Sequence, residues 1–209
     1  MKTLLTLAIL LAAAPAALAD GLPDYGLSTL TIATPGQIMM RVHPDGSGPA
    51  FTEALQRPGQ QVDGTVTLLL LDGFGLPIFG FPAEDIWLAP FTGGLELCGS
   101  PVGLIPDHDT DVNGMTEWVA AKAAGGYSSG VSLVYVNGIP LTSSVGLDLC
   151  FTSPDLNGDG TVSLSDGGMF TGDLFGVYAE RSDLNWDGVI NLSDVGIIAD
   201  AMGSGCGDR

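Results

Sequence analysis

The chain has 209 residues, of which 45% are hydrophobic and 14% charged, and its 24 acidic and 6 basic side chains give a formal net charge of −18. A high apolar content with few charges excludes an intrinsically disordered chain. So acidic a surface repels nucleic acid and anionic lipid, so we expect cations, neutral glycans or proteins as partners.

The first nineteen residues have the pattern of a secretory signal peptide. Lys2 is followed by an apolar run over residues 4–18, which ends in the small-residue site Ala17-Leu18-Ala19. This pattern predicts a signal peptide over 1–19 with cleavage before Asp20. The run is also shorter than the span of about 20 apolar residues that a transmembrane helix needs. We therefore expect a secreted, extracellular protein with no membrane span after cleavage.

Residues 20–151 alternate short apolar runs with Gly, Pro and Asp, a spacing typical of an all-β sandwich or barrel. About 130 residues is enough for one domain with its own core. The expected strands are 28–33, 37–42, 65–71, 78–81, 85–88, 95–98, 115–120, 131–136 and 145–150.

Two segments of this region carry a family resemblance. Residues 72–77 read Asp-Gly-Phe-Gly-Leu-Pro, and residues 110–114 read Thr-Asp-Val-Asn-Gly ahead of an alternating strand. Both resemble hairpin signals of bacterial immunoglobulin-like domains, over roughly residues 65–136. The resemblance implies an adhesive or spacer sandwich rather than an enzyme.

Asp109, Asp111 and Asn113 copy the first half of a calcium-binding loop. The twelfth position of such a loop would be Ala120, so the closing carboxylate is missing. We interpret the segment as a hairpin turn in which Asn113-Gly114 adopts positive backbone angles. A third, weakly bound ion is the alternative.

Catalytic patterns are weak. Residues 126–130 match G-x-S-x-G, but both histidines, His43 and His108, precede Ser128, whereas a nucleophile elbow needs a later one. No motif pairs two carboxyl groups as a glycosidase requires. We therefore expect no enzyme. Four aromatic residues could form a sugar-stacking face and leave a glycan as an alternative ligand, although such residues usually belong to the core: Trp87, Trp118, Tyr127 and Tyr135.

Three cysteines suit an exported protein with one disulfide and one remaining thiol. Cys98 and Cys150 both end alternating apolar segments, so they could bridge within one sandwich. Cys150 with Cys206 is the rival pairing, and the sequence leaves the connectivity open.

Two twelve-residue stretches near the C-terminus, 155–166 and 183–194, repeat one calcium-loop pattern. Calcium takes about 6 to 8 oxygen ligands, and such a loop supplies them from positions 1, 3, 5, 7, 9 and 12. Gly160 and Gly188 stand at position 6, where the loop turns sharply. Plain Asx-rich turns are the alternative for a single copy, but two copies in register favour two Ca²⁺ ions. The predicted ligands are Asp155, Asn157, Asp159, Thr161, Ser163 and Asp166 in the first loop, and Asp183, Asn185, Asp187, Val189, Asn191 and Asp194 in the second.

The duplication over residues 154–206 resembles a type I dockerin, the calcium-dependent docking module of secreted bacterial enzyme assemblies. Position 12 is Asp rather than the Glu of an EF-hand, and no amphipathic helix precedes either loop. The resemblance implies partner contacts at loop positions 10 and 11, which are Leu164-Ser165 and Leu192-Ser193. It also implies a cohesin-like β-sandwich as partner.

Together these patterns predict an all-β immunoglobulin-like sandwich followed by a small α-helical calcium-binding dockerin-like domain. The expected function is non-catalytic protein–protein docking outside the cell. Residues 169–177 and 197–205 contain no Lys or Arg, which many dockerins use against cohesin. This favours the alternative that another copy of the chain is the partner, so that head-to-tail docking builds a filament or surface layer. A carbohydrate-binding accessory role in polysaccharide degradation is a third alternative.

Overall fold

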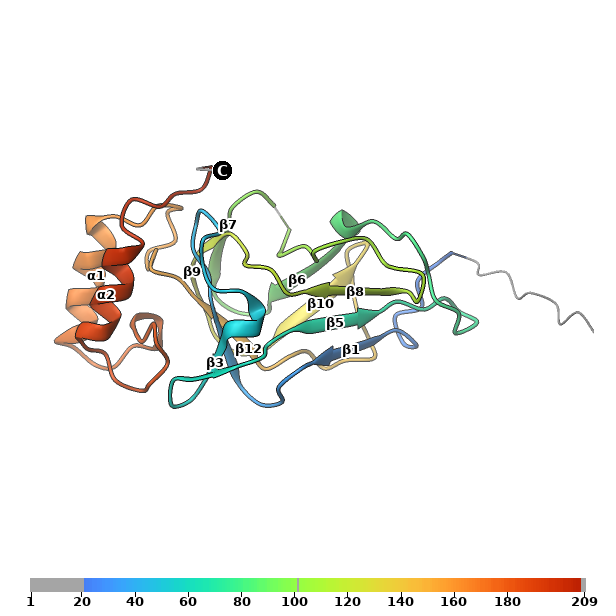
Figure 1. The fold of residues 1–209 in the computed structure, drawn as a ribbon, viewed down its shortest axis with the longest axis horizontal. Helices are drawn as coiled ribbons and strands as arrows, with labels where there is room; N and C mark the ends of the chain where they lie inside the picture. Colours follow the sequence, from blue (N-terminus) through green and yellow to red (C-terminus); the bar gives the residue numbers. More distant parts are fainter. Residues whose placement is uncertain (1–20, 101, 208–209) are drawn as a thin grey trace, which may run out of the picture.

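The computed structural model describes residues 21–100 and 102–207; the predicted signal peptide lies outside them. The described chain is mostly β-sheet, with a small helical module at its C-terminal end. The module lies at one end of an elongated molecule, and the sheets extend away from it along the long axis (Figure 1). No helix among the described residues is long and apolar enough to cross a membrane.

The strands form three sheets. Two have three strands each, in the orders β1-β5-β8 and β11-β10-β6, and the third has six, in the order β4-β3-β2-β12-β9-β7. Between the named strands of the described residues, every pairing is antiparallel except that of β12 with β2. The bounds are β1 Thr29–Ile32, β2 Ile38–Arg41, β3 Ala54–Gln56, β4 Gln60–Val62, β5 Val66–Leu69, β6 Ile86–Pro90, β7 Gly94–Leu97, β8 Met115–Trp118, β9 Ala124–Ser128, β10 Ser132–Val136, β11 Ile139–Pro140 and β12 Leu149–Thr152, with 3₁₀ turns η1 Phe51–Glu53, η2 Ala83–Asp85 and η3 Glu180–Ser182.

All three sheets pack around one apolar core. Side chains alternate between the two faces of a strand, so every second residue of β5 points inward. Val66 and Leu68 are fully buried, and Val66 lies opposite Trp118 on β8. Met40 and Phe151 bring the six-stranded sheet into the same cluster, and Val134 brings in β10.

Strand β9 was not expected from the sequence. Its segment, Ala-Gly-Gly-Tyr-Ser, lacks the β-branched residues that mark strands. It lies between β7 and β12, and a Cβ at Gly126 would come within 2.1 Å of the Gly94 carbonyl oxygen, so close backbone packing requires glycine there. Ser128 is buried on this strand, and the strand leads into β10 rather than into a helix. The strand-turn-helix arrangement that a nucleophile elbow needs is therefore not formed at Ser128. Strands β3 and β4 were also missed, and the strand expected over 78–81 does not form.

The C-terminal module has its own small core. Helices α1 (Leu164–Leu174) and α2 (Leu192–Asp200) lie side by side (Figure 1). The second apolar cluster is formed between them by Leu156, Val162, Phe170, Leu184, Ile198 and Ala201.

The disulfide joins Cys98 to Cys206, so both pairings expected from the sequence are wrong. Cys150 is a buried free thiol on β12, packed against Met39 and Trp186 and out of reach of the other two. The C-terminal segment instead pairs back onto the module: the N–H of Cys206 donates to the carbonyl of Gly160 at 2.8 Å. That contact brings Cys206 to the end of β7, so the disulfide ties the module to the sandwich.

Replacing both bonded cysteines, Cys98→Ser with Cys206→Ser, should lower the free energy of unfolding by about 2–4 kcal/mol, because the bond closes a long loop of the unfolded chain. Guanidinium unfolding measures the loss, and Cys150→Ala is the control that leaves the disulfide intact. Alkylation of denatured, unreduced protein should label Cys150 alone; labelling of Cys98 would contradict the pairing.

Candidate functional site

The two predicted loops occupy equivalent places in the module. Loop 1 (residues 155–166) follows β12 and enters α1, and loop 2 (residues 183–194) follows η3 and enters α2. Each helix starts with a capping box, Ser163 with Asp166 and Asn191 with Asp194. Because each box fixes the first turn of its helix, it also places the last aspartate of its loop.

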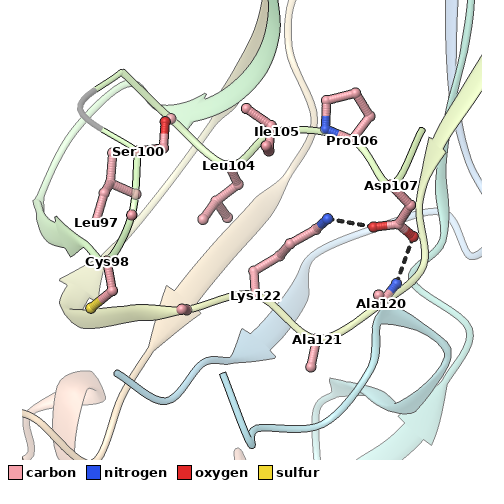
Figure 2. A pocket seen from close by; sticks show the side chains of 13 residues that line it. Leu97, Cys98, Ser100, Leu104, Ile105, Pro106, Asp107, Ala120, Ala121 and Lys122 are labelled. Carbon is pink, nitrogen blue, oxygen red and sulfur yellow. Dashed lines mark hydrogen bonds and ion pairs between the residues drawn. The ribbon is translucent and has the colours of Figure 1, made fainter. Parts of the chain in front are cut away.

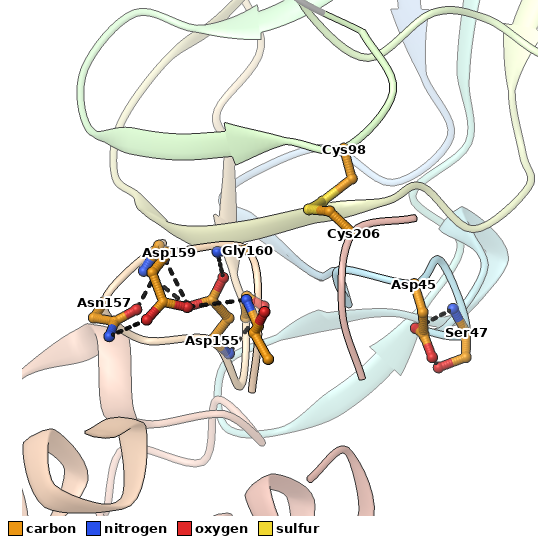
Figure 3. Close-up of a disulfide and its surroundings, with 11 residues drawn as sticks. Asp45, Ser47, Cys98, Asp155, Asn157, Asp159, Gly160 and Cys206 are labelled. Carbon is orange, nitrogen blue, oxygen red and sulfur yellow. Dashed lines mark hydrogen bonds between the residues drawn. A yellow bond between two sulfur atoms is a disulfide. The ribbon is translucent and has the colours of Figure 1, made fainter. Parts of the chain in front are cut away.

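Loop 1 folds around the carboxylate of Asp155. Its Oδ2 accepts the N–H of Gly160 at 2.8 Å, and its Oδ1 accepts the N–H of Asp159 at 3.2 Å. Asp159 accepts the Asn157 amide at 2.9 Å and the Thr161 N–H at 3.0 Å. Figure 3 shows these polar side chains turned toward one another within the loop.

Loop 2 repeats this network around Asp183. Its Oδ2 accepts the N–H of Gly188 at 3.0 Å, and its Oδ1 accepts the N–H of Asp187 at 3.1 Å. Asp187 accepts the Asn185 amide at 2.8 Å and the Val189 N–H at 2.8 Å. The two loops therefore share one geometry as well as one sequence pattern.

The closing aspartates complete both networks. Asp166 accepts the N–H of Asn157 at 3.1 Å and that of Ser163 at 2.8 Å, and Asp194 makes the matching contacts in loop 2 at 3.2 and 2.9 Å. The last residue of each loop is thus hydrogen-bonded back to the third. Hydrogen bonds thus link the polar residues within each loop, and their role as calcium ligands stays a prediction.

Four of these aspartates have no exposed surface: Asp155, Asp166, Asp183 and Asp194. Burial raises the pKa of Asp155, and the nearby charge of Asp166 raises it further. Burial likewise raises the pKa of Asp194, with the charge of Asp183 acting in the same direction. Neither loop contains a Lys or Arg, so each holds buried negative charge that no residue of its own offsets.

The residues predicted to contact a partner lie on the surface. Leu164 is 85% exposed and Leu192 is 80% exposed, at the first helical position of α1 and α2. Ser165 and Ser193 beside them are also exposed. Two large apolar side chains thus face solvent at equivalent positions of the repeat.

The segment with Asp109, Asp111 and Asn113 forms a turn, and its carboxylates accept hydrogen bonds from nearby backbone N–H groups. Asp111 accepts the backbone N–H groups of Asn113 and Met115 at 2.8 and 2.9 Å. Asp109 accepts the N–H of Ala83 at 2.9 Å. These contacts favour the hairpin interpretation.

The four aromatic residues do not share one face. Trp118 is buried and donates its indole N–H to the Leu104 carbonyl at 2.7 Å. Tyr127 donates to Glu180 of the C-terminal module at 2.8 Å. Trp87 and Tyr135 stack on each other across β6 and β10, with ring centroids 5.8 Å apart.

The module sits on the sandwich through Trp186, a residue that the sequence analysis missed. Its ring is fully buried against Met39, Cys150 and Leu55, and Arg57 covers it at 4.1 Å from the ring centroid. Burial raises the pKa of the Cys150 thiol to about 12. A sequence signal existed, because Trp186 stands at loop position 4, where loop 1 has Gly158. Both adopt positive φ, which a tryptophan rarely does.

A pocket of about 360 Å³ lies in the sandwich, between residues 97–100, 103–107 and 120–123. Figure 2 shows Lys122 reaching across it to Asp107. The two form an ion pair, and Asp107 also accepts the N–H groups of Val119 and Ala120, both at 2.8 Å. These contacts outweigh the effect of burial and lower the pKa of Asp107. The pair neutralises the charges of the described lining residues, so we see no catalytic arrangement in the pocket.

Asp107→Asn should lower stability at pH 7 by about 1 kcal/mol, because a charge-assisted contact is lost. The lowered pKa of Asp107 means that its stabilisation is complete above the unfolded-state pKa of about 4 and is lost as pH falls through the folded-state value. The difference from wild type should therefore shrink in acid, measured by urea unfolding from pH 7 to pH 3. The exposed Glu84→Gln is the control, and a constant difference would contradict the assignment.

Neither a protein-family model nor a characterised protein matches this chain. Among solved structures, the chain is similar to invasin, a bacterial integrin-binding protein, at 18% identity and a TM-score of 0.31. That alignment covers 59% of this chain, which spans only 19% of the invasin chain. Two interface mutants of a type II cohesin–X-dockerin complex from Acetivibrio cellulolyticus match with 20% and 19% identity and TM-scores of 0.28 and 0.29, covering 61% and 83% of this chain and 89% and 100% of those chains. TM-scores this low do not establish a shared fold, so the function rests on this chain's own residues.

Proposed function

We propose that loops 1 and 2 each bind one calcium ion, and that the chain is a secreted, non-catalytic protein whose dockerin-like C-terminal module docks onto a protein partner. The observation that carries this proposal is the repeated hydrogen-bond network around Asp155 and Asp183. The two loops lie at different places in the chain but have the same hydrogen-bond geometry. Each has a buried aspartate at both ends.

The residues fit a hard cation. Among residues 21–100 and 102–207, no three His, Cys, Asp or Glu side chains by themselves gather as a metal centre. A site in either loop therefore also draws on amide, hydroxyl and main-chain oxygens, which are ligands that calcium accepts and softer metals do not prefer. An ionised carboxylate has about four lone-pair sites, so Asp155 can keep its N–H contacts and still ligate.

A bound ion supplies the positive charge that each loop lacks. The chain's part is to hold the ligands in place before binding: the capping boxes place Asp166 and Asp194, and the position-6 glycines turn the loop. Since Val162 is buried in the module core, the folding of loop 1 is also linked to helix packing. Calcium should thus stabilise the whole module.

Isothermal titration of the mature protein should show two calcium ions, and each bound ion should raise the free energy of unfolding by about 2.7 kcal/mol at one hundred times its Kd. Asp159→Ala and Asp187→Ala should each leave one ion, because each removes a ligand from one loop. Asp111→Asn should leave two. A third ion in the wild type that Asp111→Asn removes would show a third site, and an unfolding temperature that is insensitive to chelation would refute calcium binding.

The partner-binding surface that we propose is the exposed apolar face at the helix starts, centred on Leu164 and Leu192. Another side of the module, with Trp186, lies on its own sandwich and is held there by the disulfide. A second copy could not use that side without opening this contact. That side is closed to a separate protein and to a second copy alike, so the choice between these two partners is left to the light-scattering test.

Leu164→Glu with Leu192→Glu should abolish capture of a partner from the secreted proteins of the source organism, while stability stays within about 0.5 kcal/mol because both side chains are exposed. Phe79→Glu, which replaces a 70% exposed residue of the sandwich, is the matched control. Light scattering with and without calcium measures self-assembly. Oligomers that the double variant abolishes would identify the partner as another copy.

A further inference from the structure

The sandwich touches the first aspartate of loop 1. A Cβ at Gly125, on β9, would lie 1.9 Å from Oδ2 of Asp155. The neighbouring Gly126 donates its N–H to the Asp155 carbonyl at 2.7 Å. The same Oδ2 accepts the Gly160 N–H inside the loop, so β9 and the loop together set the position of this carboxylate.

A different set of contacts reaches the first aspartate of loop 2. Tyr178 donates its hydroxyl to Oδ2 of Asp183 at 2.5 Å, and Arg57 donates to the Tyr178 oxygen at 2.9 Å. Arg57 belongs to the turn between β3 and β4 and also covers the buried ring of Trp186. In the same turn, Gly59 donates its N–H to the Trp186 carbonyl at 2.8 Å. The sandwich thus reaches the carboxylate through one tyrosine.

These contacts converge on equivalent atoms of the two loops. Asp155 and Asp183 both hold loop position 1, and both are fully buried at the seam between module and sandwich. Packing of the seam alone would not require that the contacts fall on the same ligand position twice.

We propose that the sandwich positions the first calcium ligand of each loop, Gly125 by direct contact with Asp155, and Arg57 through Tyr178 with Asp183. This inference rests on the proposed calcium function. Calcium affinity then depends on whether the module is packed against the sandwich. Calcium binding in turn stabilises this packing, because coupling between two equilibria is reciprocal. Gly125, Arg57 and Tyr178 act as positioning residues and do not themselves ligate the ion.

Loop 1 is tested in the Asp187→Ala background, where one ion remains. Gly125→Ala should weaken calcium binding at least tenfold in isothermal titration, because the added Cβ displaces the Asp155 carboxylate. Gly94→Ala is the matched control on the adjacent strand β7, where a Cβ meets nothing within 4 Å, and its affinity should stay within twofold. Equal affinity of both glycine variants would overturn the proposal for loop 1.

Loop 2 is tested in the Asp159→Ala background with a conservative change. Tyr178→Phe keeps the ring but removes the hydrogen bond to Asp183, and we expect calcium affinity to fall at least threefold. Tyr127→Phe is the matched control, because it removes a hydrogen bond across the same seam that ends on Glu180, outside both loops. Equal losses in the two variants would mean that general seam packing, and not placement of Asp183, sets the affinity.

The effect of calcium on the packing between module and sandwich is measured by the reactivity of the free thiol. Cys150 is the one unpaired cysteine and lies under Trp186, so a thiol reagent reaches it only when the seam opens. Saturating calcium should slow its labelling at least fivefold in wild type, and less in Gly125→Ala and Tyr178→Phe. A labelling rate that calcium does not change, in protein that binds two ions, would refute the coupling while leaving the calcium function standing. Absence of calcium binding in wild type would instead refute the calcium function itself.

Discussion

The seating of Trp186 between the sandwich and Arg57 is the contact on which the rest of the molecule's organisation depends. It buries the ring against Met39 and the Cys150 thiol, and it fixes loop 2 on β2, β3 and β12 of the six-stranded sheet. Burial of a large aromatic side chain is among the strongest single contributions to a packed interface. With the Cys98–Cys206 disulfide on the side of loop 1, this contact makes the sandwich and the module one unit.

This arrangement limits the surface that the proposed docking function could use. A module that hangs from a flexible linker presents all of its surface to a partner. Here one side of each loop faces the chain's own sandwich. Asp155 of loop 1 contacts β9, and loop 2 is contacted by the turn that carries Arg57. Leu164 and Leu192 remain exposed, as do Phe175 and Val177. The proposed partner contacts, Leu164 and Leu192, stand at position 10 of the two proposed calcium loops, so both proposed functions use the same part of the module.

The few basic side chains of the protein and its buried aspartates are also distributed unevenly. The chain carries many more acidic than basic residues, yet one of its few arginines, Arg57, lies at the seam, and the predicted mature chain's one lysine is paired with Asp107. Burial raises the pKa of Asp155 and of Asp194, which means that their charged forms are disfavoured. A divalent cation would stabilise these charged forms. The scarce positive charges elsewhere are used for structural contacts.

The sequence by itself determined the repeat, its loop spacing, the helices that follow and the β-rich character of residues 20–151, because these depend on residue type and on local periodicity. Loop 1 and loop 2 could be drawn residue by residue, since Asp, Asn and Gly at fixed intervals define local hydrogen bonds. Only the tertiary structure decided the disulfide, the strand β9 and the contact of Trp186, because each depends on residues far apart in the chain. Gly125 illustrates the reason: nothing in its own segment predicts a strand, and its role appears only when β9 meets the carboxylate of Asp155.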